Sequence, residues 1–157
     1  MRPKRRSPST HHPPPVAFAW PVRVYYEDTD LGGVVYYANY LRFLERARTE
    51  WLRVLGFEQT ALAAVHQVVF VVRSISLDFL KPARFDDRLD VTVAPAELGA
   101  VRIVLSQLVR RGGEDLVAAQ VELACVNTAT FRPVRIPGSL LDSLRDRLPT
   151  SKTGSKT

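Results

Sequence analysis

The clearest periodic pattern in the chain is helical and covers residues 40–55. Apolar residues recur there every three or four positions and leave an arginine-rich opposite face. The apolar positions are Tyr40, Phe43, Leu44, Ala47, Trp51, Val54 and Leu55. Asn39 is a candidate N-cap, and Gly56 follows where a helix commonly ends in glycine. The pattern predicts one long amphipathic helix, with a short second helix at residues 58–65.

Strand periodicity dominates the rest of the chain. A first strand is predicted at residues 16–26, and residues 68–80 begin as a continuous apolar run and then alternate. Three more alternating segments, separated by short glycine turns, cover residues 88–98, 101–110 and 116–127. Because the turns are short, these three segments should form an antiparallel meander. A proline at its start predicts a C-terminal helix at 137–148.

The order of these elements predicts the α+β class. A strand, one long helix and then a run of four strands differs from the alternation that builds a parallel sheet. The long helix can cover one sheet face, and the alternation leaves the other face more polar. We expect one folded domain at residues 16–148, between a basic, proline-rich disordered tail at 1–15 and a second tail at 149–157.

The net charge of +6 is concentrated in these tails. They carry six of the 22 basic residues and none of the 16 acidic ones, so the segment between them is neutral. Nucleic-acid-binding domains usually carry a basic stripe on the domain itself, which argues against that function. No apolar run is long enough to span a membrane, and the N-terminus lacks the apolar core of a signal peptide. A lone Cys125 fits the cytoplasmic location that we expect.

An acidic cluster, Glu27, Asp28 and Asp30, lies between the first strand and the long helix, just before Gly32 and Gly33. A magnesium site on Asp28 and Asp30 would normally need the strand ends of a doubly wound parallel sheet. In a hydrolytic site, one carboxylate beside an apolar groove attacks a carbonyl or activates water, while N–H groups at the helix start polarise that carbonyl. The acids can also simply stabilise the helix dipole, and spacing alone leaves these interpretations open.

The common nucleophilic and cofactor-dependent sites lack their motifs in this sequence. There is no G-x-S-x-G elbow, no Cys/His cluster for zinc and no phosphate-binding loop. His66 is the one histidine expected in the folded domain, and we expect it to lie in a loop. We expect Cys125 to be a small residue of the core. We therefore expect no cofactor and no metal.

A resemblance to a known family begins at residues 22–57, which read VRVYYEDTDLGGVVYYANYLRFLERARTEWLRVLGF. This segment closely resembles the hot-dog-fold acyl-CoA thioesterases, in particular the tol-pal-associated group, and the similarity continues through residues 70–91 and 122–137. The resemblance implies hydrolysis of acyl-CoA thioesters and a five-stranded antiparallel sheet wrapped around one long central helix. It also implies a homodimer or homotetramer with active sites between subunits.

The resemblance also assigns roles to individual residues. The family's catalytic aspartate falls on Asp30, which we expect to be partly buried, and its carbonyl-polarising backbone N–H falls on Tyr37. The expected substrate-binding positions are Gly33, Val34 and Tyr36. Asp28 and Glu27 then have loop or structural roles. Many close relatives have histidine where this chain has Tyr37; because the role uses the backbone, activity should survive while acyl preference stays open.

Other functions are compatible with the same residues. A non-hydrolytic module would bind an acyl group on coenzyme A or on acyl carrier protein. A hydratase of this fold would typically need a histidine, and the motif has none. An interaction protein could act through the basic tails on acidic phospholipid or acyl carrier protein. Lys81 and Arg84 are candidates for contact with the phosphates of coenzyme A.

Overall fold

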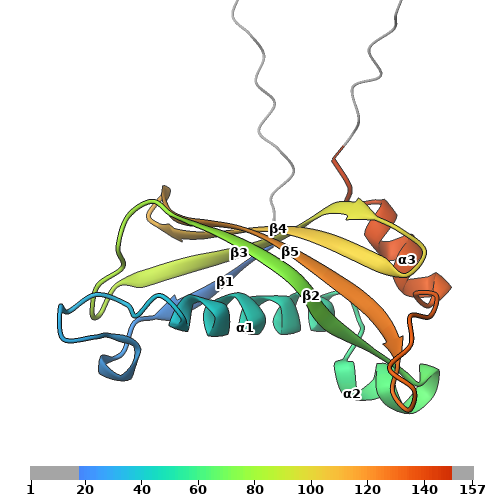
Figure 1. The fold of residues 1–157 in the computed structure, drawn as a ribbon. Coiled ribbons are helices and arrows are strands. Elements are labelled where there is room, and N and C mark those ends of the chain that lie inside the picture. The colour runs from blue at the N-terminus through green and yellow to red at the C-terminus, as the bar shows by residue number, and fades with distance from the viewer. Residues whose placement is uncertain (1–17, 150–157) are drawn as a thin grey trace, which may run out of the picture.

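A computed structural model of the protein describes residues 18–149. The helices and strands are β1 (Phe18–Arg23), α1 (Asn39–Val54), α2 (Gln59–Ala61), β2 (Val68–Phe79), β3 (Arg88–Leu98), β4 (Arg102–Arg111), β5 (Glu114–Asn127) and α3 (Gly138–Arg145). The five strands form one antiparallel sheet in the order β1-β3-β4-β5-β2, which curves over α1 (Figure 1). The expected α+β fold, with a hot-dog arrangement of sheet and helix, is confirmed.

Helix α1 forms the core with the concave face of the sheet. Most of its apolar stripe is buried as the periodicity predicted, with Phe43, Leu44 and Ala47 fully inaccessible to solvent. Val54 is the exception: it lies near the end of the helix and is exposed, so its predicted place in the core is wrong. The facing strand residues include Leu89, Val91, Val93, Ile103, Leu105, Val109, Val117 and Val121. Burying a large apolar side chain stabilises a fold by about 1.5–3 kcal/mol, so this stripe holds the helix against the sheet.

One charged side chain enters this core from α1. Arg48 Nη1 donates a hydrogen bond of 2.9 Å to Oε1 of the fully buried Gln107 on β4. Gln107 Nε2 in turn donates to the backbone carbonyls of Leu44 at 3.2 Å and Thr92 at 3.3 Å. Burial lowers the pKa of the Arg48 guanidinium. The bond ties the middle of α1 to the centre of the sheet.

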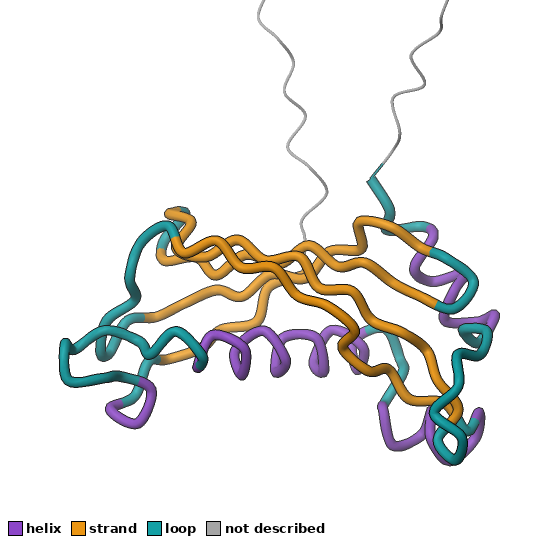
Figure 2. Tube along the Cα trace, in the orientation of Figure 1, coloured by secondary structure: helices purple, strands orange, loops and turns teal. Residues whose placement is uncertain are grey.

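The outer sheet face is more polar, as the alternation predicted. Ser76 of β2 pairs with Gln120 of β5, which pairs with Ser106 of β4, and all three are exposed. The loops gather at the two ends of the sheet, where they connect the strands and α1 (Figure 2). No helix within residues 18–149 is long and apolar enough to cross a membrane.

The two ends of α1 differ in how well the sequence predicted them. Gly56 ends the helix at φ +88°, with its N–H bonded to the Arg53 carbonyl and the Phe57 N–H bonded to the Leu52 carbonyl. This is a Schellman arrangement, so the predicted stop is confirmed. The predicted N-cap role of Asn39 is wrong. Ala38 occupies the N-cap, and Asn39 is the first helical residue, whose side chain turns inward to Asp28.

Several other boundaries also differ. The predicted second helix is one α-helical turn, α2, followed by a π-helical turn at Leu62–His66. Helix α3 is shorter than predicted, with Pro137 at its N-cap. Strand β1 ends at Arg23 because the chain then turns through a 3-10 turn at Tyr26–Asp28. Residues 16 and 17 of the predicted first strand lie outside the described residues, as do the predicted tails except Pro149.

Candidate active site

The acidic motif lies on a small hairpin between β1 and α1. The backbone of Asp30 donates to the Val34 carbonyl at 2.9 Å, and the Tyr36 N–H donates to the Asp28 carbonyl at 3.0 Å. An isolated antiparallel bridge joins Thr29 to Val35 between them. One arm of the hairpin therefore carries Asp30, and the other arm leads into α1.

Asp30 is placed at the tip of this hairpin by the two glycines. Its Oδ1 accepts the Gly32 N–H at 2.9 Å, and a Cβ at position 32 would lie 3.2 Å from the same oxygen. Gly33 follows at φ +74°, a conformation that strains other residues. The second carboxylate oxygen has no hydrogen-bond partner within residues 18–149 and is available for chemistry. The expected partial burial of Asp30 is wrong for the single chain, where the residue is exposed.

Tyr37 lies two residues before the first residue of α1. Its backbone N–H makes no hydrogen bond to any part of the chain that the structure describes, whereas the neighbouring Tyr36 N–H is used by the hairpin. An unpaired N–H just before a helix start lies in the positive field of the helix dipole and can polarise a carbonyl oxygen. The predicted role of Tyr37 therefore has an available donor.

Aromatic side chains surround this position. The ring of Tyr37 lies 4.7 Å from that of Tyr36 and 6.5 Å from that of Phe79, and Tyr40 lies 5.8 Å from Phe79, centroid to centroid. Hydrogen bonding to Tyr37 raises the pKa of Tyr36, and burial raises that of Tyr40. Both phenols therefore stay neutral at physiological pH. Sequence reasoning identified Tyr36 but missed Phe79, which arrives from the far end of β2.

Asp28 has the structural role that the sequence predicted for it. It is buried, its Oδ2 accepts the Tyr25 N–H at 2.8 Å, and its Oδ1 accepts Asn39 Nδ2 at 2.6 Å. These bonds join the 3-10 turn to the first residue of α1. Glu27 is exposed in the same turn and makes no side-chain hydrogen bond or ion pair within residues 18–149.

The segment after β2 supports the second arm of the hairpin. The Val35 N–H donates to the Ala83 carbonyl at 2.8 Å, and an antiparallel bridge joins Val34 to Arg84. The Ala83 N–H donates to Tyr40 Oη at 3.1 Å. Residues 82–84 thus act as a short third strand beside the hairpin.

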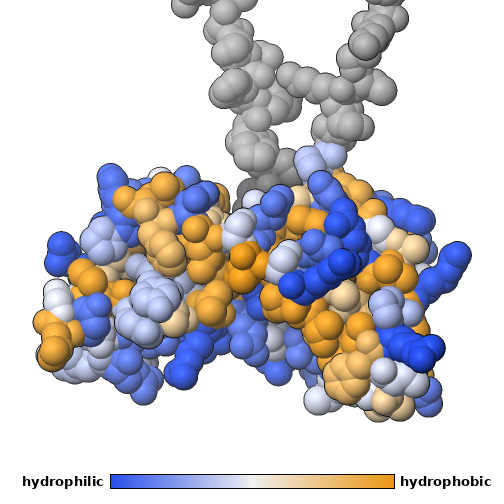
Figure 3. Space-filling model, viewed as in Figure 1, coloured by the Kyte–Doolittle hydropathy of each residue, from blue (hydrophilic) through white to orange (hydrophobic). Residues whose placement is uncertain are grey.

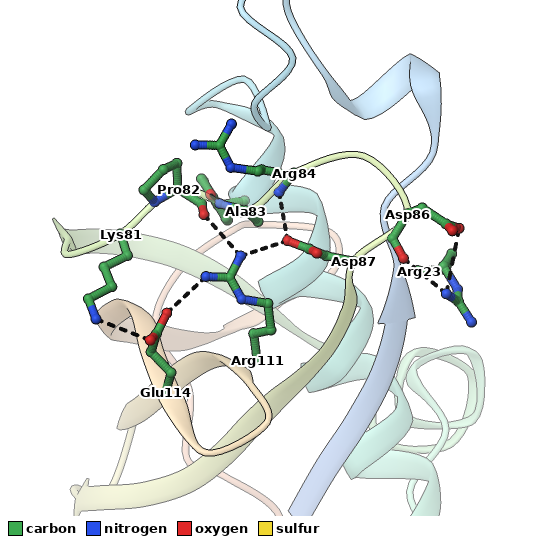
Figure 4. Close-up of polar contacts among 10 residues, drawn as sticks. Arg23, Lys81, Pro82, Ala83, Arg84, Asp86, Asp87, Arg111 and Glu114 are labelled. Carbon is green, nitrogen blue, oxygen red and sulfur yellow. Dashed lines mark hydrogen bonds and ion pairs between the residues drawn. The ribbon is translucent and has the colours of Figure 1, made fainter.

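Arg111, at the end of β4, anchors that segment in turn (Figure 4). It donates to Asp87 and Glu114 at 2.8 Å each and to the Pro82 carbonyl at 3.3 Å, while Lys81 donates to Glu114 at 3.1 Å. Hydrogen bonds from Lys81 and Arg111 lower the pKa of Glu114. For Asp87, burial acts to raise the pKa, but hydrogen bonds from the Arg84 N–H and Arg111 outweigh it and lower the value.

Comparison with known proteins identifies the family. Residues 32–118 match the thioesterase superfamily. The chain belongs to the thioesterase superfamily. It is 46% identical over 120 residues to a Haemophilus influenzae protein named acyl-CoA thioesterase YbgC, covering 76% of this chain and 88% of that one. It is 43% identical to the Escherichia coli acyl-CoA thioester hydrolase YbgC, covering 79% of this chain and 92% of that one.

A solved structure agrees with this assignment. The probable thioesterase from Bartonella henselae is 40% identical and superposes with a TM-score of 0.73, covering 76% of this chain and 98% of that one. The superfamily match begins two residues after Asp30, so that match itself assigns no role to the aspartate.

Neither Cys125 nor a metal centre competes with this site within residues 18–149. Burial raises the pKa of the Cys125 thiol to about 11, which keeps it protonated. No group of three metal-ligating side chains occurs between residues 18 and 149. The apolar cavity of about 570 Å³ lies at the opposite end of α1, beside Trp51 and Val54, and includes none of the predicted site residues.

Proposed function

We propose that the protein hydrolyses acyl-CoA thioesters to a carboxylic acid and coenzyme A. One observation carries this proposal. The partly unpaired Asp30 carboxylate and the unpaired Tyr37 N–H belong to the two arms of one hairpin at the start of α1. A carboxylate and a fixed hydrogen-bond donor are what hydrolysis of an activated ester requires when no serine or histidine takes part. The names of the YbgC relatives support the same substrate class.

In this reaction, the thioester carbonyl oxygen accepts the Tyr37 N–H, which stabilises the negative charge that develops there. Asp30 either attacks the carbonyl carbon and forms a mixed anhydride, which water then hydrolyses, or removes a proton from an attacking water. In both cases the carbon–sulfur bond breaks and coenzyme A leaves as the thiol. Gly33, Val34 and Tyr36 line the thioester end of the substrate.

A second subunit would complete this site. Within residues 18–149, strand β2 pairs with β5 alone, so its other backbone edge is open there. Apolar side chains extend along the front of the molecule over it (Figure 3). Phe79 is 52% exposed and Tyr37 is 63% exposed, although both are large aromatic residues. Such surface normally marks an interface. We therefore propose a homodimer or homotetramer with active sites between subunits, which light scattering after gel filtration would measure directly.

The test of function is thiol release from a panel of acyl-CoA esters with short, long and aromatic acyl groups. Asp30→Asn keeps the shape of the side chain but removes its charge, and should lower kcat by roughly 10²–10⁴-fold. Glu27→Gln is the matched control, since it removes an exposed carboxylate from the same loop. Near wild-type turnover in Asp30→Asn would refute the role of Asp30. Saturable binding of acyl-CoA without thiol release by the wild type would instead identify a binding module.

A further inference from the structure

Four cations and three carboxylates meet around the segment that follows β2. Arg23 pairs with Asp86 at 3.5 Å, Lys81 pairs with Glu114 at 3.1 Å, and Arg111 lies between Asp87 and Glu114. The fourth cation is Arg84. Its guanidinium makes no ion pair or hydrogen bond with any residue from 18 to 149, and Figure 4 shows it pointing away from the Arg111 network. The group therefore carries one uncompensated positive charge, on Arg84.

The backbone of Arg84 is held firmly although its guanidinium is not paired. The Arg84 N–H donates to Asp87 Oδ2 at 2.8 Å, and the residue bridges to Val34. Val34 itself accepts the backbone N–H of Asp30 at 2.9 Å. The backbone of Arg84 thus lies directly beside the hairpin that carries the carboxylate. Its long side chain extends from a fixed point at the rim of the candidate site.

We propose that Arg84 binds a phosphate group of the thioester's carrier. This inference rests on the proposed acyl-CoA hydrolysis and names the residue that recognises the carrier. The flexible pantetheine arm separates the phosphates of coenzyme A from the reacting carbon, so a cation at the rim fits better than one beside Asp30. A planar guanidinium donates two parallel hydrogen bonds to phosphate oxygens. Lys81, the other sequence candidate, is already engaged by Glu114.

The same phosphate chemistry occurs in two carriers. Coenzyme A has a pyrophosphate and a ribose phosphate, whereas the prosthetic group of acyl carrier protein has a single phosphodiester. A series with one acyl group separates these sources: acyl-CoA, acyl-4′-phosphopantetheine and acyl-pantetheine, which has no phosphate. Arg84→Gln removes the charge, Arg84→Lys keeps it without the planar fork, and Arg135→Gln is the control, because it removes an exposed arginine at the other end of the sheet.

Arg84→Gln should raise KM for acyl-CoA about tenfold, as expected for loss of a charge-assisted hydrogen bond near the surface, with kcat unchanged. KM for acyl-pantetheine should not change, and Arg84→Lys should be intermediate. A similar rise with acyl-4′-phosphopantetheine assigns the contact to the phosphate next to the pantetheine arm; a rise with acyl-CoA alone assigns it to the nucleotide phosphates. Both results support the proposal, and the Arg135→Gln values should match wild type throughout.

Two results would overturn the proposal: an unchanged KM for acyl-CoA in Arg84→Gln, or an equal loss with acyl-pantetheine, which would place Arg84 at the thioester or in the fold. Calorimetric titration with free coenzyme A makes the test independent of catalysis. If wild type releases no thiol from any ester, the proposed hydrolysis fails. The tenfold rise in Kd expected for Arg84→Gln would still support phosphate binding, and an unchanged Kd would refute it.

Discussion

The bond between Asp28 and Asn39 gives a quantitative test of how the hairpin is held to α1. Asp28→Leu keeps the volume of the side chain close to that of the wild type but removes both acceptors. Two donors, the Tyr25 N–H and Asn39 Nδ2, then lose their partners. An unsatisfied buried donor costs about 1–3 kcal/mol. Tyr25 is mostly exposed, so its N–H can recover a water, and the total expected loss is about 3 kcal/mol.

Asp28→Asn is the matched variant for this experiment. Its oxygen can still accept the Tyr25 N–H, and its amide can donate to the Asn39 side-chain oxygen once that amide turns over, so both bonds persist. The expected loss is therefore only about 1 kcal/mol, mainly from the missing charge at the helix start. Urea unfolding followed by circular dichroism measures both values, and Asp28→Leu should lower Tm by roughly 10 °C.

Two outcomes would refute this reasoning. If Asp28→Leu stays within about 1 kcal/mol of wild type, the buried bonds contribute little and the hairpin is held by residues 82–84 instead. If Asp28→Asn is as unstable as Asp28→Leu, the charge rather than the pair of acceptors matters. Combining each variant with Asn39→Ala gives a coupling energy, which should be large in the cycle with Asp28→Leu and small in the cycle with Asp28→Asn, where a bond to residue 39 persists.

Three further predictions concern the rest of the fold. Gln107→Leu leaves the Arg48 guanidinium without its buried acceptor and should cost about 3 kcal/mol in urea unfolding, whereas adding Arg48→Met should recover most of that loss. Because burial raises the pKa of Cys125 to about 11, a disulfide reagent at pH 8 should label the thiol only after unfolding; rapid labelling of native protein would contradict its burial. Because the pKa values of Asp87 and Glu114 are lowered in the folded protein, their charged forms stabilise the fold at pH values above the ordinary carboxyl pKa. The urea midpoint should therefore fall as the pH drops through about 4. A midpoint that stays constant over this pH range would exclude the contribution.

The sequence predicted those parts of the fold that depend on local periodicity. The apolar stripe of α1 has a strict helical spacing, and the β3-β4-β5 meander follows from alternation and short turns. The long β2 segment was predicted only in outline. Its pairing with β5 shifts by one residue between Val72 and Ser74, where Arg73 is the extra residue of a bulge. Because of this shift, Phe70 and Val72 before the bulge lie on the same inner face as Ile75 and Leu77 after it. A bulge has no dependable signal in alternation, because it is defined by the partner strand.

The candidate site was predicted less completely than the fold. Asp30 and Tyr37 came from the resemblance of their motif, and the structure adds which of their atoms are unpaired. Asn39 was misassigned because an asparagine before an apolar run favours an N-cap. Its side chain instead bonds the buried Asp28, a tertiary contact that the local sequence does not indicate. Phe79 and Arg111 were missed because nothing in their local sequence relates them to the hairpin.

The anchoring of the hairpin has a consequence for the order in which the protein becomes active. Asp30 leaves the ribosome early. Arg111, which bonds the Pro82 carbonyl beside the hairpin, and Glu114, which bonds Arg111, follow roughly eighty residues later, a delay of seconds at ordinary rates of synthesis. Contacts so distant in sequence form late, because the chain must close a long loop first. The nascent N-terminal half can thus form α1 without a fixed hairpin, and the candidate site is complete only after the last two strands of the sheet have been made.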